Sequence, residues 1–141
     1  MNAGRKLSMS KCVLDSSALL SYLSNEEGAA KVEALLLAST CMSTVNWAEV
    51  LSKASNLGKN VEEISALFED RGLIGGTTEL FPLTIEDAKK TAHLRSLTKA
   101  LGLSLGDRAC LALALRLGLP VITADRAWSK LKLPVEIRTI R

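Results

Sequence analysis

Histidine and cysteine are scarce in this sequence, and their scarcity argues against several kinds of catalytic and metal site. His93 is the only histidine, and it falls midway along a predicted helix with a polar face, where we expect it to be exposed. Neither a Ser-His-Asp nor a Cys-His arrangement is therefore favoured. Cys12, Cys41 and Cys110 each lie in an apolar stretch and form no Cys-x-x-Cys pair. We expect them to be reduced core residues of a cytoplasmic protein, not a disulfide framework or a zinc site.

Long apolar runs and glycine-rich nucleotide motifs are also missing. No segment reaches the roughly 18 apolar residues of a membrane span, so we expect no membrane partner. The opening stretch "MNAGRKLSMSK" has basic residues without the apolar run of a secretory signal. Neither G-x-G-x-x-G nor G-x-x-x-x-G-K-[ST] occurs, since the "GLIGG" stretch has the wrong spacing. Dinucleotide-binding and P-loop functions are therefore not indicated.

The composition that remains fits one soluble domain. The chain has 141 residues, of which 48% are hydrophobic and 23% charged, enough to bury roughly two-thirds of the unfolded surface. We expect residues 1–10 to be a flexible tail and residues 11–141 to form the domain. The net charge of +3 neither demonstrates nor excludes a nucleic-acid partner. Cations dominate the stretch from Arg126 to Arg141, which we interpret as a solvated surface or, alternatively, as a phosphate-binding patch.

Short apolar strands alternate with helices along the chain. Strands are predicted at residues 11–15, 40–44, 78–83, 119–125 and 135–140. Helices are predicted at residues 17–23, 30–38, 46–57, 60–72, 84–101, 104–118 and 126–131. This alternation predicts βαβ units, and strands without inward–outward alternation are typical of a sheet covered on both faces. The expected fold is a three-layer α/β/α domain with a mostly parallel central sheet.

Four acidic residues fall at one edge of this predicted sheet. Asp15 and Asp125 end the first and fourth strands, Glu49 lies in the first turn of the helix after the second strand, and Asp107 begins the helix before the fourth. Ligand sites in open α/β sheets form at the carboxyl ends of the strands. Each acid alone also fits a helix cap, because "NWAE" and "SLGD" have the capping-box spacing.

Electrostatic repulsion makes four separate caps an incomplete explanation. Two carboxylates about 4 Å apart repel by roughly 4 kcal/mol at an effective dielectric of 20, whereas a cap contributes about 1 kcal/mol and a helix dipole about 0.3–1 kcal/mol more. Such a group must spread out, take up protons or bind a cation. Oxygen ligands favour Mg²⁺ or Mn²⁺ over zinc. An ion held there can activate water and neutralise a phosphate, which is the chemistry of a phosphodiesterase or nuclease.

Four stretches of the sequence together resemble a known family. "VLDSSALLSYL", "STVNWAEV", "LSLGDRACLALA" and "PVITADRAW" occur in the order found in PIN domains, and in particular in the VapC-type toxins of toxin–antitoxin pairs. The resemblance spans Val13 to Trp128. It implies a PIN-like fold and a Mg²⁺- or Mn²⁺-dependent endoribonuclease that acts on RNA. It also implies a homodimer, silenced by a small antitoxin whose tail fills the acidic groove.

The resemblance also assigns roles to individual residues. The catalytic and metal-binding acids would be Asp15, Glu49, Asp107 and Asp125. Glu49 would complete the site either as a direct ligand or through a water molecule. Thr123, in the strand-end "T-x-D" pattern, would orient ligands or water, and Ser17 matches a small polar position beside the first acid. Water activated by the metal would attack phosphorus, so no side-chain nucleophile is needed.

Other interpretations remain open at this stage. Arg108 and Arg126 are candidates for contacts to the RNA backbone, with salt bridges to neighbouring acids as the alternative. A catalytically silent PIN-like module would use the acidic pocket only to dock a basic partner segment. An aspartyl-nucleophile phosphatase would also place an acid at the end of the first strand, but that class resembles Asp-x-Asp, and this chain has "DSS". Trp47 and Trp128 are predicted to be core residues.

Overall fold

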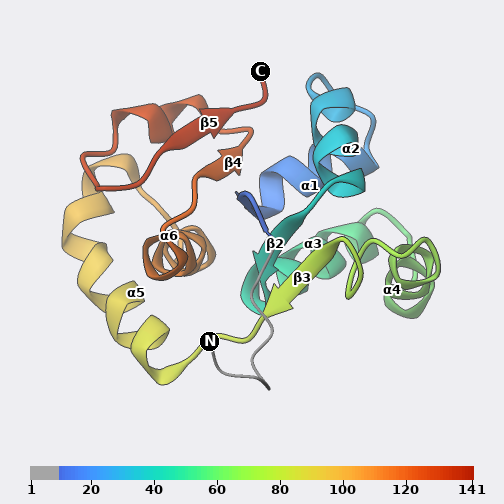
Figure 1. Cartoon of the computed structure of the whole chain (residues 1–141), viewed down its shortest axis with the longest axis horizontal. Helices are drawn as coiled ribbons and strands as arrows, with labels where there is room; N and C mark the ends of the chain where they lie inside the picture. The colour runs from blue at the N-terminus through green and yellow to red at the C-terminus, as the bar shows by residue number, and fades with distance from the viewer. Residues whose placement is uncertain (1–9) are drawn as a thin grey trace, which may run out of the picture.

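The computed structural model describes residues 10–141, and its strands alternate with helices as expected (Figure 1). The strands are β1 (Val13–Leu14), β2 (Thr40–Ser43), β3 (Thr78–Phe81), β4 (Val121–Thr123) and β5 (Ile137–Thr139). The α-helices are α1 (Ser16–Leu23), α2 (Ala29–Leu37), α3 (Thr44–Asn56), α4 (Val61–Asp70), α5 (Ile85–Thr98) and α6 (Leu105–Leu117). Two 3₁₀ helices are η1 (Lys99–Leu101) and η2 (Arg126–Lys130). The predicted tail, residues 1–10, lies outside the described residues except for Ser10, whose hydroxyl donates to the carbonyl of Thr40.

The five strands form one sheet in the order β3-β2-β1-β4-β5, and every pairing is parallel. The predicted parallel sheet is therefore confirmed. The short central strand β1 pairs on both sides, since Val13 aligns with Cys41 of β2 and with Val121 of β4. The strand order reverses between β1 and β4, and a reversal of this kind opens a crevice at the carboxyl ends of the two strands.

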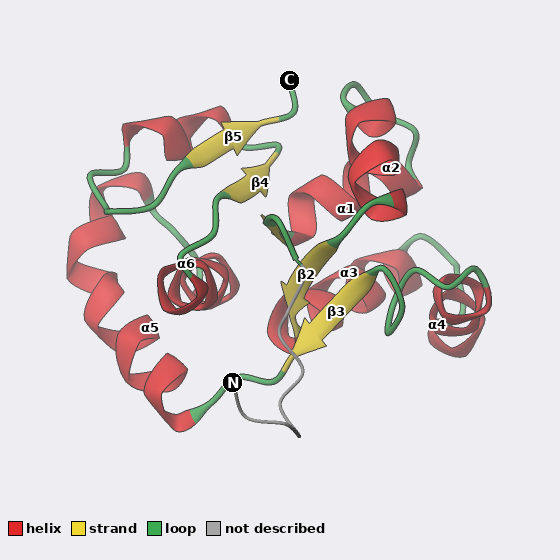
Figure 2. Ribbon diagram, in the orientation of Figure 1, coloured by secondary structure: helices red, strands yellow, loops and turns green. Residues whose placement is uncertain are grey.

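Helices cover both faces of the sheet, which confirms the three-layer fold (Figure 2). Helices α1 to α4 contribute to one hydrophobic cluster, and α5, α6 and η2 contribute to the other. Neighbouring strand residues divide between the clusters: Leu14 packs with the first and Val13 with the second. Successive side chains of a strand point to opposite sides. Two apolar residues in a row therefore make both faces of the sheet apolar. Among residues 10–141, no helix is long and apolar enough to cross a membrane.

The predicted core residues are buried. Trp47 is 8% exposed and Trp128 1%, and the three cysteines are buried and unpaired. Helix α6 is enclosed from Ala109 to Ala114, with no residue there more than 2% exposed, as its apolar sequence predicts. The exposed position expected for His93 is also confirmed.

The start of α3 differs from the prediction. Ser43, not a residue of the "NWAE" stretch, caps the helix: its backbone is extended, and its side chain accepts a hydrogen bond from the amide of Val45. The helix therefore begins at Thr44, and Glu49 lies in its second turn instead of its first. Because the cap is supplied by Ser43, the side chain of Asn46 is free to bond elsewhere.

Candidate functional site

Asp15 lies where β1 ends and α1 begins, and its side chain is almost completely buried. It is the N-cap of α1, and Oδ1 accepts a hydrogen bond of 2.8 Å from the amide of Ala18. The hydroxyl of Ser17 donates to the carboxylate at 2.8 Å, and Thr123 Oγ1 donates to Oδ2. Burial raises the pKa of Asp15 from its usual 3.8 to about 6, although these hydrogen bonds favour the charged form and oppose the rise. The negative charge of Asp107 adds to the rise.

Thr123 and Ser17 connect the carboxyl ends of β1 and β4. Thr123 is fully buried, donates to Asp15 and accepts a hydrogen bond from the amide of Asp125. Ser17 accepts a hydrogen bond from the amide of Ala124 at 3.0 Å. A hydroxyl can donate one bond and accept others, so each of these side chains joins the two strands. Thr123 therefore links the carboxylate of Asp15 to the backbone of Asp125.

Glu49 of α3 is partly buried and lies against α1 and α6. Its Oε1 accepts hydrogen bonds from Ser16 Oγ at 2.9 Å and from Asn46 Nδ2 at 3.0 Å. The same Nδ2 donates to the carbonyl of Gly106 at 3.0 Å. A Cβ atom at position 106 would lie 2.4 Å from Glu49 Oε1, so only glycine leaves room for the carboxylate. Since Ser16 follows Asp15 and Gly106 precedes Asp107, these contacts bring three of the acidic segments together.

Asp107 and Asp125 both serve as caps in the structure. Asp107 forms the capping box of α6: its amide donates to Ser104 Oγ at 3.1 Å, and its Oδ2 accepts from the amide of Ser104 at 3.0 Å. Asp125 is exposed, and its Oδ1 accepts a hydrogen bond of 2.9 Å from the amide of Ala127 at the start of η2. The capping interpretation is therefore correct for both, and each cap engages only one oxygen of the carboxylate.

The acidic side chains are not assembled around a single point. Within residues 10–141, no group of three or more His, Cys, Asp or Glu side chains is positioned to hold a metal ion as it stands. The charge of Asp107 is close enough to raise the pKa of Asp15, whereas Asp125 turns toward η2. The topology brings the acids to one edge of the sheet, and Asp15, Asp107 and Asp125 each bond to the start of a different helix.

The chemistry of this site nevertheless fits a hard divalent cation. Its donors are carboxylate and amide oxygens, which Mg²⁺ prefers in proteins. Asn46 is fixed in orientation because its Nδ2 faces two acceptors, so its buried Oδ1 has no donor among the described residues. A buried oxygen without a donor is uncommon and suits a cation or one of its water ligands. Asp15 is likewise a buried acid with no cationic partner among its described contacts.

The two candidate arginines have different surroundings. Arg126 is exposed and lines a polar cavity of about 570 Å³ together with Ser17 and Asp125; its Nε donates to the carbonyl of Arg141 at 2.8 Å. Arg108 is buried and donates from Nη1 to the carbonyl of Thr91. In the part of the chain that the structure describes, neither forms a salt bridge. The salt-bridge alternative is therefore wrong for both.

Ser16, Asn46 and Gly106 belong to the site but were not predicted from the sequence. Gly106 left a detectable signal, because glycine in a helix is about 1 kcal/mol less favourable than alanine. Ser16 and Asn46 left none, since small polar residues are common near helix starts.

Comparisons with known proteins agree with the fold. A family model described as the PIN domain matches residues 12–133. A toxin–antitoxin complex from Klebsiella pneumoniae has a chain with a TM-score of 0.66 and 21% identity, covering 90% of this chain and 100% of that one. A chain of DNA-bound VapBC from Salmonella typhimurium has a TM-score of 0.68 and 20% identity, and the match covers 94% of this chain and 100% of that one. A chain of FitAcB from Neisseria gonorrhoeae has a TM-score of 0.68 and 22% identity, and the match covers 92% of this chain and 97% of that one. A comparison with curated proteins finds no match.

Proposed function

Because this chain belongs to the PIN domain family, whose members are generally nucleases, we propose that it is a metal-dependent endoribonuclease and the toxin of a toxin–antitoxin pair. Asp15 is the observation that carries the proposal. It is a buried carboxylate with a raised pKa, held by hydrogen-bond donors at the reversal between β1 and β4. Perturbed acids of this kind mark functional sites. The similarity to solved toxin–antitoxin complexes supports the partner.

The acids would hold Mg²⁺ or Mn²⁺, and their neighbours would fix them in place. Direct ligands would be Asp15, Asp107 and Asp125, and Glu49 would complete the site. When bound, the ion supplies a Lewis acid that activates water and neutralises charge on the phosphate. Thr123 and Ser17 orient Asp15, while Ser16 and Asn46 hold Glu49. Loss of a neighbour that orients a metal ligand commonly lowers metal affinity or activity by about 10–100-fold.

The proposed partners follow from the same assignment. We expect an RNA substrate, an antitoxin that occupies the acidic groove, and a homodimer acting in the cytoplasm. Size-exclusion chromatography of the purified chain, alone and with a co-expressed antitoxin, measures whether the chain is a homodimer and whether it binds the antitoxin.

Metal dependence tests the proposed reaction. Purified chain is incubated with total cellular RNA in Mg²⁺ or Mn²⁺, and the products are separated on a denaturing gel. We expect cleavage that stops when EDTA is added and returns with excess Mg²⁺, because the acids hold the ion that activates water. Cleavage that continues in EDTA contradicts a metal mechanism. No cleavage in either metal, with antitoxin binding that survives loss of Asp15, would instead favour a silent binding module.

Gly106→Ala tests the placement of Glu49. The added Cβ would lie 2.4 Å from Glu49 Oε1, so the carboxylate must leave its bonds to Ser16 and Asn46. We expect cleavage to fall by about tenfold or more. Stability should change by less than about 1 kcal/mol, because alanine favours the helix and the displaced carboxylate ends a flexible side chain. Cleavage is measured beside urea unfolding, and Gly118→Ala, at the C-cap of α6 with φ of 67°, serves as a control away from the acids. Unchanged cleavage by Gly106→Ala would exclude a role for this position of Glu49.

A further inference from the structure

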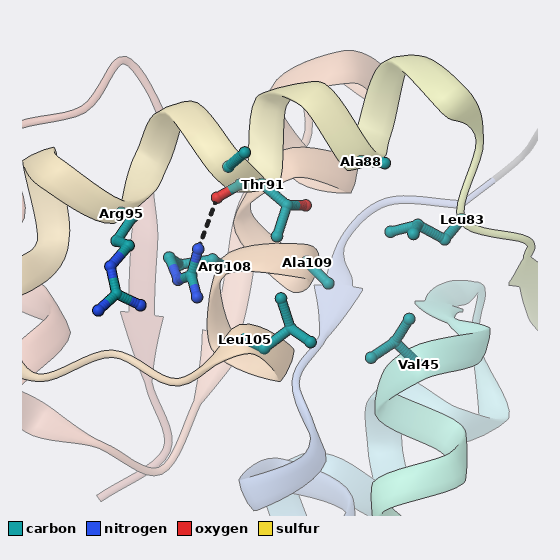
Figure 3. A pocket seen from close by; sticks show the side chains of 9 residues that line it. Val45, Leu83, Ala88, Thr91, Arg95, Leu105, Arg108 and Ala109 are labelled. Atoms are coloured by element: carbon teal, nitrogen blue, oxygen red, sulfur yellow. Dashed lines mark hydrogen bonds between the residues drawn. The ribbon is translucent and has the colours of Figure 1, made fainter.

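A second cavity, without any acidic residue, lies beside the proposed catalytic centre. It has a volume of about 310 Å³ and opens between the start of α3, the helix α5 and the first turns of α6 (Figure 3). Leu105 and Arg108 of α6 line it, and they flank Asp107 and Gly106, the latter lying against Glu49. Val45 of α3 lines it as well, next to Asn46. The same two helix starts therefore border both the acids and this cavity.

The charged groups in the cavity are both arginines. Arg95 and Arg108 lie at one end, and Val45 and Leu83 lie at the other (Figure 3). Arg108 is only 7% exposed, and its Nη1 donates to the carbonyl of Thr91 at 2.8 Å. Its Nε is buried and has no hydrogen-bond partner within residues 10–141. A buried guanidinium with an unused donor and no paired acid favours an anionic ligand.

The positive surface continues beyond this cavity along α5. A neighbouring cavity of about 390 Å³ shares Ala92 and Arg95 with the first and adds His93, Ser96 and Lys99. No acid lines it either. Two linked cavities with cations and without acids fit an extended polyanion better than a single carboxylate.

Apolar walls complete the binding surface. Val45 and Leu83 line the end of the cavity away from the arginines, and Leu105 lies between that end and Arg108 (Figure 3). Leu105 is 64% exposed although it is a large apolar residue. An aliphatic slot beside guanidinium groups can take an unstacked base and its phosphate. Proteins recognise single-stranded RNA through this combination of apolar or stacking surfaces and basic grooves.

We propose that single-stranded RNA binds along this surface, with one base in the cavity between α3, α5 and α6. Phosphates next to that base contact Arg108 and Arg95, and the strand continues along α5 past Ser96 and Lys99. The scissile bond reaches the acids across the first turn of α6. This inference rests on the proposed function for the identity of the polyanion, and it adds the route of the substrate.

Binding without cleavage tests the route. Fluorescence anisotropy of a fluorescein-labelled single-stranded RNA of mixed sequence is measured in EDTA with the full chain. Arg95 is exposed, so Arg95→Gln should fold normally. We expect it to raise Kd by about fivefold to tenfold and to lower the slope of log Kd against log salt by about 1. Lys59→Gln, an exposed cation between α3 and α4, is the matched control and should change Kd by less than about twofold.

Leu105→Ser tests the base slot separately. It should weaken binding of single-stranded RNA and leave the salt slope unchanged, because it removes no charge. An unlabelled duplex of the same sequence should compete less well than the single strand, since its bases stay stacked.

Three results of the binding measurements would overturn the route. They are no measurable RNA binding by the unmodified chain, equal Kd values for Arg95→Gln and Lys59→Gln, or a changed oligomeric state of Leu105→Ser with unchanged RNA affinity. The last result would make this face a contact between copies of the chain. Metal-dependent cleavage that survives Arg95→Gln unchanged would remove the route and leave the proposed nuclease in place. RNA binding without cleavage in any metal would leave the route in place and contradict the proposed nuclease activity.

Discussion

Asp15→Asn is expected to abolish RNA cleavage and also to stabilise the metal-free protein. An uncharged amide cannot replace the carboxylate as a ligand, so cleavage should fall by at least about a hundredfold, the upper end of what even indirect metal contacts contribute. The gain in stability follows from burial, because the unmodified protein must keep a charge in a buried site with no cationic partner among the residues that the structure describes.

The raised pKa of Asp15 determines how the free energy of unfolding changes with pH. Burial raises the pKa of Asp15 from 3.8 to about 6, so the folded state binds this proton more tightly than the unfolded state. The stabilising contribution is fully present below pH 3.8 and is lost as the pH rises through about 6. The whole difference corresponds to about 3 kcal/mol. Asn should recover about 1–2 kcal/mol of it, because its amide nitrogen replaces one of the oxygens that accept hydrogen bonds.

Urea unfolding in EDTA measures the effect at pH 8 and at pH 4. At pH 8 the variant should have the larger free energy of unfolding, and at pH 4 the unmodified protein should be the more stable by about 1 kcal/mol, because protonated Asp15 still makes most of its contribution there. Mg²⁺ should stabilise the unmodified protein and have no effect on Asp15→Asn, because a ligand stabilises only the state that binds it. A variant less stable than the unmodified protein at pH 8 would mean that the charged form of Asp15 supports the fold.

The second large effect is expected at Asp107, where a cap and a ligand share one carboxylate. Asp107→Asn keeps an oxygen that can accept the hydrogen bond from the amide of Ser104 and loses only the charge at the helix start, about 0.3–1 kcal/mol. Cleavage should nevertheless fall by about a hundredfold or more, because Asn is a poor substitute for a charged metal ligand.

Ser104→Ala is the matched control, since it removes the other half of the same capping box. The amide of Asp107 loses its acceptor, which should cost about 1 kcal/mol, while both oxygens of Asp107 remain. We expect thermal unfolding at a lower temperature with cleavage largely retained. If Asp107→Asn cleaves normally and is simply about 1 kcal/mol less stable, then Asp107 is a cap alone.

The sequence predicts the parts of this structure that depend on local patterns. Apolar runs locate the five strands, and a carboxylate at a strand end must lie at the carboxyl edge of a parallel sheet, which places Asp15 and Asp125. The capping box at Ser104 is equally local, since its partners are three residues apart.

Contacts between distant segments could not be predicted in the same way. The bond between Ser16 and Glu49 joins positions 33 apart, and that between Asn46 and Gly106 joins positions 60 apart. Both depend on how α1, α3 and α6 pack, which no local pattern encodes. The same packing buries Arg108 against α5, although arginine is seldom fully buried. The local pattern favours Asn46 as a cap, because it contains no sign of the bond that Asn46 makes to the carbonyl of Gly106 on another helix.

Thr123 donates to a carboxylate 108 positions earlier in the chain, and this separation sets when the centre can form during synthesis. The N-terminal part of a chain emerges from the ribosome first, so Asp15, Glu49 and Asp107 are all translated before Thr123. Until β4 pairs with β1, Asp15 lacks both the hydroxyl of Thr123 and one wall of its dry surroundings. A nascent chain that has not yet made β4 therefore carries most of the acids and no organised centre. The arrangement of Asp15 and Thr123 seen in the structure therefore cannot form before β4 has been translated.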